Sequence, residues 1–234
     1  MSASGAVPFC IEVITLVPEI WPVILGRASG LVGRAFEEQE DTLRLLVHDL
    51  RDHGVGKHRQ VDDTPYGGGP GMLLQIEPLH QAITLAKSRT PGPVIMLAPD
   101  GEPFTQAHAQ ELADGPGFTV LCGRYEGFDA RVNHFVDRRY ALGQAVLSAG
   151  DPAAWCMIDA TVRLRPGILG NPASLQEESF GANLAGEYPQ YSRPAVYKGY
   201  EVPEVLRSGD HGKIRAWRDA HSQKADHTQG EVTP

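Results

Sequence analysis

Four glycines fall within five residues in the run Tyr66-Gly-Gly-Gly-Pro-Gly-Met72. Glycine has no Cβ, so this run can adopt backbone conformations closed to other residues and can approach a ligand closely. It lacks the Lys-Ser/Thr pair of a nucleotide-triphosphate loop, which argues against phosphate hydrolysis. Composition alone leaves two interpretations open, a ligand-binding loop and a flexible surface loop.

Three further loops follow apolar segments. They are Pro99-Asp-Gly101, Gly123-Arg-Tyr-Glu-Gly127, and residues 142–150, which contain two glycines. Ligands in parallel α/β sheets usually bind at the carboxyl ends of the strands. The three loops therefore predict one ligand site, although each run taken alone is equally compatible with a turn that ends a strand.

The elements that position these loops follow from hydrophobic patterning. Apolar and β-branched runs predict strands over 9–17, 42–50, 94–98 and 118–122, and helical spacing predicts helices over 77–89, 105–113 and 152–162. Strands that alternate with helices indicate a parallel α/β sheet. The predicted division is a domain over 1–166, a Pro- and Gly-rich linker over 167–185, a small mainly helical domain over 186–222 and a disordered tail over 223–234. In the small domain, Ser208 is the predicted N-cap of a helix over 208–221, with Asp210 in its first turn.

Bulk properties bound the function. The 234 residues carry a net charge of −8, so no sequence-wide basic field would attract a polyanion. A local basic set could still hold RNA or could be scattered surface charge: Arg51, Lys57, Arg59, Arg138, Arg139, Arg163 and Arg165. The three cysteines lack zinc-site spacing and are interpreted as free thiols, and no secretory or membrane-spanning segment is found. The expectation is a cytoplasmic protein that has no membrane association and no metal site demanded by ligand spacing.

Three stretches together resemble the TrmD-type tRNA (guanine-N1) methyltransferases of the SPOUT superfamily. They are residues 58–72, residues 122–132, and residues 166–174 with the later runs 191–194 and 202–211. The resemblance extends from about Phe9 to Arg218. It implies an α/β domain whose parallel sheet contains a deep C-terminal trefoil knot, with S-adenosylmethionine as methyl donor. It also implies a homodimer with the active site between subunits, tRNA as partner, and possible use of Mg²⁺.

The resemblance also assigns site residues. Glu178, in the run Gln176-Glu-Glu-Ser-Phe180, stands where the family has an aspartate base, and Arg163 matches the family's arginine. A carboxylate can accept the N-1 proton of guanine, and a cation can stabilise charge that develops on the ring carbonyl. The implied cofactor-binding residues are Leu97, Pro99, Gly123, Tyr125, Glu126, Leu142, Gly143, Gln144, Ala145, Val146, Leu147 and Gly150. The implied substrate-binding residues are Arg59, Tyr66, Gly67, Gly68, Gly69, Pro70 and Gly71.

Several positions depart from the family pattern. Aspartate is replaced by Glu178, the Ser-Gly-Gly-Glu loop reads Ser148-Ala-Gly-Asp151, and Ile-Gly-Asp-Tyr reads Leu142-Gly-Gln-Ala145. A Thr-His-Asp element is replaced by Gly54-Val-Gly56, and an arginine-rich C-terminal segment is absent. Residues 191–234 hold seven Lys/Arg and six Asp/Glu, a net of 7 − 6 = +1. Three hypotheses follow: methylation of tRNA next to the anticodon, methylation of a different and small acceptor, and a non-catalytic RNA-binding relative.

Overall fold

The computed structural model describes residues 7–169, 184–186 and 188–224. The chain divides into two compact units, residues 1–170 and 171–234, which are described separately. The boundary between them falls within the predicted linker.

The first unit is built on a five-stranded sheet in the order β2-β1-β6-β5-β7, and every neighbouring pair is parallel. This confirms the predicted parallel α/β architecture; the trefoil knot stays a prediction. The strands are β1 (Phe9–Thr15), β2 (Leu43–Asp49), β5 (Val94–Pro103), β6 (Gly117–Leu121) and β7 (Arg138–Ala141). Both β1 and β6 are buried along their whole length, as expected for central strands covered on two faces.

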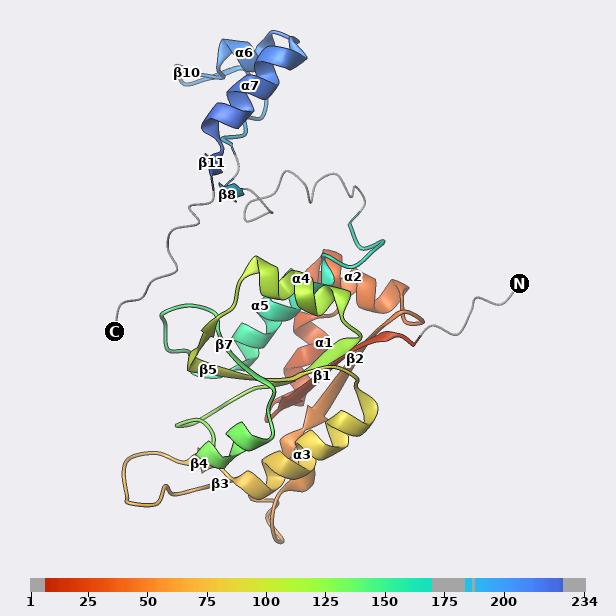
Figure 1. Cartoon of the computed structure of the whole chain (residues 1–234), viewed down its shortest axis with the longest axis vertical. Coiled ribbons are helices and arrows are strands. Elements are labelled where there is room, and N and C mark those ends of the chain that lie inside the picture. Colours follow the sequence, from red (N-terminus) through yellow and green to blue (C-terminus); the bar gives the residue numbers. More distant parts are fainter. Residues whose placement is uncertain (1–6, 170–183, 187, 225–234) are drawn as a thin grey trace, which may run out of the picture. The chain divides into compact units, whose positions relative to one another are not determined.

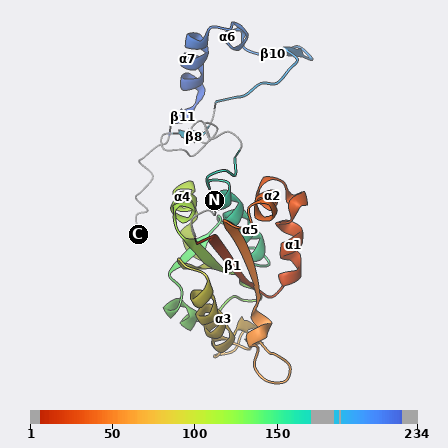
Figure 2. The ribbon, with the colours of Figure 1, turned by 90° about the vertical axis from the view of Figure 1, so that its right-hand side faces the viewer.

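Helices cover both faces of the sheet (Figures 1 and 2). On one face lie α1 (Trp21–Ile24), α2 (Leu31–Glu38), α4 (Gln106–Asp114) and α5 (Asp151–Val162), whose apolar side chains pack with Ile11 and Val13 of β1. On the other lies α3 (Ile76–Arg89), which packs with Ile14. Short 3-10 turns complete the unit: η1 (Pro18–Ile20), η2 (Arg27–Ser29), η3 (Leu50–His53) and η4 (Ala130–His134). The predicted helices over 77–89, 105–113 and 152–162 correspond to α3, α4 and α5 within a residue at each end.

One strand runs on beyond its predicted end. The sequence predicted that it stops at Ala98 before a Pro99-Asp-Gly turn, but β5 continues to Pro103. Both Leu97 and Glu102 pair with Tyr140 of β7, so residues 98–101 bulge out of the ladder. At Gly101 an added Cβ would lie 2.6 Å from the Tyr140 carbonyl carbon, so the bulge packs tightly on the neighbouring strand. The turn residues are therefore present, but they interrupt the strand instead of ending it.

The second unit contains two helices and short strand pairs. The helices are α6 (Glu204–Arg207) and α7 (His211–His221), and the strands are β8 (Leu184–Gly186), β9 (Val196–Tyr197), β10 (Tyr200–Glu201) and β11 (Gln223–Lys224). The predicted cap was wrong. Ser208 is the C-cap of α6, and Asp210 is the N-cap of α7, because its carboxylate accepts from the backbone of Gly212 and Lys213. Residues 223 and 224, assigned from sequence to the disordered tail, pair instead with β8.

A buried ionic cluster joins β1, β2 and α3. The fully buried carboxylate of Glu12 lies 3.1 Å from His48 Nδ1 and accepts from Arg89 (2.7 Å) and from the Thr90 hydroxyl (2.9 Å). The second ring nitrogen of His48 lies 2.8 Å from His53 Nε2. Burial alone would raise the pKa of Glu12, but hydrogen bonds from His48 and Thr90 and the Arg89 charge hold that pKa below its ordinary value.

We expect Glu12→Gln to lower the free energy of unfolding at pH 7 by about 3 kcal/mol, because it leaves Arg89 without its buried anion. A carboxylate whose folded-state pKa is depressed stabilises above its ordinary pKa of 4.5 and loses that contribution as the pH falls through its folded-state pKa. Urea unfolding at pH 7 and at decreasing pH below 4.5 should show the gap between wild type and variant shrinking. The exposed Glu77→Gln on α3 serves as control, with a change of about 0.5 kcal/mol or less. A gap that stays constant with pH would contradict this account.

Candidate active site

A cavity of about 740 Å³ lies at the carboxyl edge of the sheet. Its walls come from the β5 bulge, from the loop after β6, from the loop after β7 and from the first turns of α5. Every cofactor-binding residue predicted from the sequence lines this cavity except Gln144, which is exposed and is not part of its wall. The three loops that the strand pattern pointed to therefore meet in one place.

Two of these loops touch through their backbones. The amide of Gly150 donates to the carbonyl of Gly123 at 2.8 Å. A Cβ added at Gly150 would lie 2.7 Å from the Gly123 nitrogen and 2.9 Å from the Cys122 Cα, and a Cβ added at Gly123 would lie 2.8 Å from the Phe128 ring. Backbone cannot yield as a flexible side chain can, so these two glycines allow an approach that no other residue would.

The glycine-rich run reaches the same cavity wall. It forms the loop between β3 (Asp62–Asp63) and β4 (Leu73–Leu74), which pair antiparallel. The amide of Glu126 donates to the Met72 carbonyl at 3.0 Å, and a Cβ added at Gly71 would lie 2.4 Å from Glu126 Cγ. Gly71 has φ +82°, a conformation that side chains rarely adopt. The end of the predicted substrate loop is therefore fixed against Glu126.

The tip of that loop is open. Tyr66 is fully exposed, and Gly67, Gly68 and Gly69 have positive φ, with no heavy atom closer than 3.9 Å to a Cβ built on any of the three. Arg59 lies outside this loop, before β3, and its guanidinium is paired with Asp52 and with the Arg51 carbonyl. The substrate role of these residues stays a prediction.

Charged side chains line two sides of the cavity. Arg139 from β7 pairs with Asp100 in the β5 bulge, and its guanidinium lowers the pKa of that carboxyl. Arg124 and Glu126 lie in the loop after β6, on either side of Tyr125, which has φ +58°. Beneath this loop, burial and the Asp151 charge raise the pKa of the Cys122 thiol well above its usual value. Cys122 is therefore a neutral thiol near pH 7 and is not a nucleophile.

The predicted catalytic pair is not brought together by the described structure. Arg163 is the half-buried C-cap of α5, where its charge favourably meets the helix dipole. Glu178 lies outside the described residues. Members of the predicted basic set are paired with carboxylates: Arg59 with Asp52, Arg138 with Glu111, and Arg139 with Asp100. These positions therefore carry less net positive charge than the sequence suggests.

Sequence reasoning missed several residues of the cavity wall. Arg124 stands between two predicted residues, and Asp100 directly follows Pro99, so position along the chain could have indicated both. Arg139 and Cys156 gave no such signal, because the exposure of one strand and one helix face decides their place. Asp151 is buried under the wall and was noted only as a departure from the family pattern.

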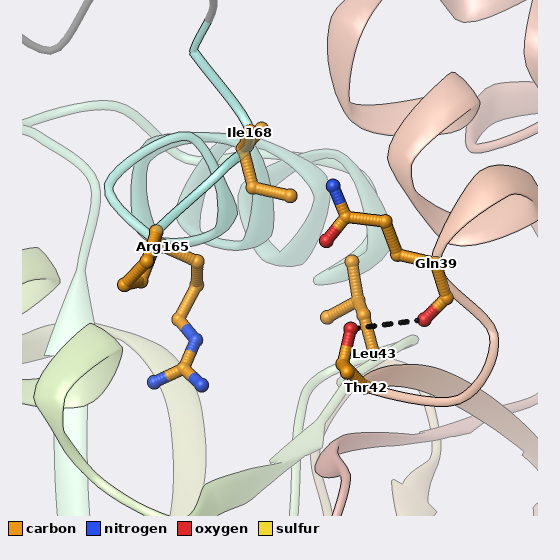
Figure 3. A pocket seen from close by; sticks show the side chains of 6 residues that line it. Gln39, Thr42, Leu43, Arg165 and Ile168 are labelled. Carbon is orange, nitrogen blue, oxygen red and sulfur yellow. Dashed lines mark hydrogen bonds between the residues drawn. The ribbon is translucent and has the colours of Figure 1, made fainter. Parts of the chain in front are cut away.

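A second, smaller cavity of about 340 Å³ lies between the end of α2, the start of β2 and the turn after α5 (Figure 3). Gln39, Leu43 and Ile168 form part of its wall. Arg165 also lines it, and its guanidinium lies 4.4 Å from the centre of the Phe9 ring and donates to the Ala113 carbonyl. It contains none of the predicted binding residues.

Comparison with known proteins decides the family. The family model described as "tRNA (Guanine-1)-methyltransferase TrmD" matches residues 9–231. This chain belongs to the TrmD family. It is 47% identical to a tRNA (guanine-N(1)-)-methyltransferase of Roseobacter denitrificans, over 91% of this chain and 88% of the relative. It is 48% identical to one of Novosphingobium aromaticivorans (92% and 86%) and 49% identical to one of Ruegeria pomeroyi (91% and 87%).

Two searches of the TrmD-family chain concern the described residues only. No helix there is both long and apolar enough to cross a membrane. Within the same residues, no group of three or more His, Cys, Asp or Glu side chains is arranged to hold a metal ion.

Proposed function

We propose that this protein transfers a methyl group from S-adenosylmethionine to N-1 of guanosine next to the anticodon of tRNA. Membership of the TrmD family over nearly the whole chain carries this proposal, and the relatives at 47–49% identity are named for that reaction. Two of the sequence stretches that carry the family resemblance also meet at one point, where Glu126 contacts Gly71.

The cavity suits the methyl donor in size and chemistry. Pockets of about 300–1,000 Å³ hold ligands of this class, and this one has about 740 Å³. Leu142, Val146 and Leu147 would cover the adenine, while the backbone at Gly123 and Gly150 allows close approach. Glu126 would face the positive end of the amino-acid part. When bound, S-adenosylmethionine supplies the methyl group.

Proton transfer is assigned to Glu178 and Arg163. At neutral pH guanine N-1 carries a proton, which must leave as the methyl group arrives. We assign Glu178 as the base that accepts this proton and Arg163 as the cation that stabilises negative charge on the ring oxygen. The family resemblance supports both roles.

The proposed enzyme is a cytoplasmic homodimer with its active site between subunits. The family resemblance supports this arrangement. The resemblance also implies a use of magnesium, but the residues described by the structure contain no cluster that fits a resident Mg²⁺, so no step is assigned to it.

A second candidate acceptor is a small nitrogen-containing molecule. The near-neutral charge of residues 191–234 and the pairing of Arg59, Arg138 and Arg139 favour it, because phosphate contacts supply most non-specific affinity for nucleic acid. With tRNA as the acceptor, affinity should fall steeply with salt, whereas a flat salt response would favour the small acceptor.

The test is methyl transfer from labelled S-adenosylmethionine to an unmodified tRNA that has guanosine 3′ of the anticodon, with nucleoside mass spectrometry of the product. Formation of 1-methylguanosine at catalytic rates establishes the proposed reaction. Donor binding with unmodified tRNA would redirect the search to small acceptors. Binding of both donor and tRNA without transfer to any acceptor would support a non-catalytic RNA-binding role.

Cysteine labelling tests the position of the donor. Cys156 is exposed and lines the cavity, whereas Cys10 and Cys122 are buried. We expect N-ethylmaleimide to modify Cys156 alone in the folded protein, and saturating S-adenosylmethionine to slow that modification several-fold, as followed by intact-protein mass spectrometry. Cys156→Ser, the matched control, should remove the reaction. Unchanged labelling of Cys156 at saturating donor would contradict the proposed binding position.

A further inference from the structure

A buried carboxylate lies directly under the cavity floor. Asp151, the first residue of α5, is 1% exposed. Its Oδ1 accepts from the Thr15 hydroxyl at 2.5 Å and from the Trp21 indole at 3.2 Å. Its Oδ2 lies 3.8 Å from Arg124 Nε. Neither Oδ2 nor that Nε, both buried, has a hydrogen-bond partner among the described residues.

The two oxygens of Asp151 therefore have different surroundings. Two neutral donors satisfy Oδ1 and anchor the carboxylate to β1 and α1. Oδ2 faces a guanidinium, and burying a carboxylate is costly unless an opposite charge compensates it. The start of α5 gives further compensation through its helix dipole. Asp151 thus presents a fixed negative charge to Arg124 from below the wall.

Arg124 is the other half of this pair. It belongs to the cavity wall, and its side chain is about one-third exposed. A guanidinium has five N–H donors in a rigid plane, so a partner on the Nε side fixes the plane while the other donors stay available for an acceptor. Glu126, two residues further along the same loop, also lines the cavity.

We propose that Asp151 is a positioning residue that orients Arg124 to bind the carboxylate of the amino-acid end of S-adenosylmethionine. An amino-acid group carries a carboxylate and an ammonium side by side, and Arg124 and Glu126 place a cation and an anion on one loop of the wall. This inference rests on the proposed function, because it needs that donor in this cavity.

Isothermal titration calorimetry on the full-length protein tests the inference. The ligands are S-adenosylmethionine and its decarboxylated analogue, which lacks only the carboxylate. Losing one charge-assisted contact costs about tenfold in affinity. Wild type should therefore bind the complete donor about tenfold more tightly than the analogue. Arg124→Gln and Asp151→Asn should each reduce this preference to near one, and the double variant should be no worse than Arg124→Gln.

The variants separate positioning from folding. Asp151→Asn keeps an oxygen for Thr15 and Trp21 but removes the charge that faces Arg124. Thr15→Val removes one anchoring hydrogen bond and keeps the charge, so it should lower the melting temperature while preserving the preference for the complete donor. If Asp151→Asn does not fold, Arg124→Gln still tests the carboxylate contact.

The outcomes distinguish the two proposals. If wild type binds neither ligand, the proposed function fails and this inference fails with it. If wild type binds the donor but Arg124→Gln keeps the full preference for the carboxylate, only this inference is overturned. A loss of preference in Arg124→Gln with none in Asp151→Asn would overturn the positioning role of Asp151.

Discussion

Replacing Gly150 by alanine is expected to weaken S-adenosylmethionine binding by about 100-fold, the scale of loss that a misplacement of about 1 Å can cause at a site. The new Cβ would lie 2.7 Å from the Gly123 nitrogen and 2.9 Å from the Cys122 Cα, so the loops after β6 and β7 must separate. Both loops are walls of the cavity. Such overpacking also costs about 1–3 kcal/mol of stability. Calorimetry and thermal unfolding measure the two effects.

Gly143→Ala is the matched control for Gly150→Ala. Gly143 lines the same cavity in the same loop, but a Cβ added there meets nothing within 4 Å and its φ is not positive. Its alanine variant should keep wild-type stability. Wild-type donor affinity in Gly150→Ala would show that the loops move apart without consequence, and would contradict the requirement for glycine.

Glu178→Gln is expected to reduce kcat for methyl transfer by about 10²–10⁴-fold, the range typical for loss of a general base. The amide keeps the shape of the carboxylate but does not accept the N-1 proton. Donor affinity should stay unchanged, because the role assigned to Glu178 concerns the acceptor. Single-turnover kinetics with tRNA and calorimetry with S-adenosylmethionine separate the two quantities.

The neighbouring Glu177→Gln makes the same charge change one residue away and should retain wild-type kcat. Wild-type turnover in Glu178→Gln would remove its role as base. Equal losses in both variants would point to the charge of the segment and not to one proton acceptor.

The two variants also test the proposed subunit arrangement. Gly150→Ala impairs the donor cavity and Glu178→Gln impairs the base. If the active site lies between subunits, a mixed dimer holds one site with an intact cavity and an intact base. Mixing the two inactive proteins under conditions that exchange subunits should therefore restore part of the activity. No restoration, with exchange verified by native mass spectrometry, would place both residues in the same subunit's site.

The sequence failed where local pattern and tertiary context disagree. Residues 31–38 were not predicted as a helix, although they form α2; their Gly33 is disfavoured in a helix by propensity. The structure shows why glycine is needed there, since an added Cβ would lie 2.0 Å from the Gly26 carbonyl oxygen. Likewise, the chain names a turn at Pro99-Asp-Gly101, and only pairing of Tyr140 with both Leu97 and Glu102 turns it into a bulge.

The sequence by itself determined the parallel α/β sheet, most of its strands and helices, and the loops that border the cavity. Those features arise from contiguous residues: buried β-branched runs, helical spacing, and glycines that follow strands. The tertiary structure alone decided that Glu126 meets Gly71, that Gly150 touches Gly123, and that Asp151 faces Arg124. Each of these contacts joins segments from different strands, and a distance between them depends on sheet order and register, which no local pattern encodes.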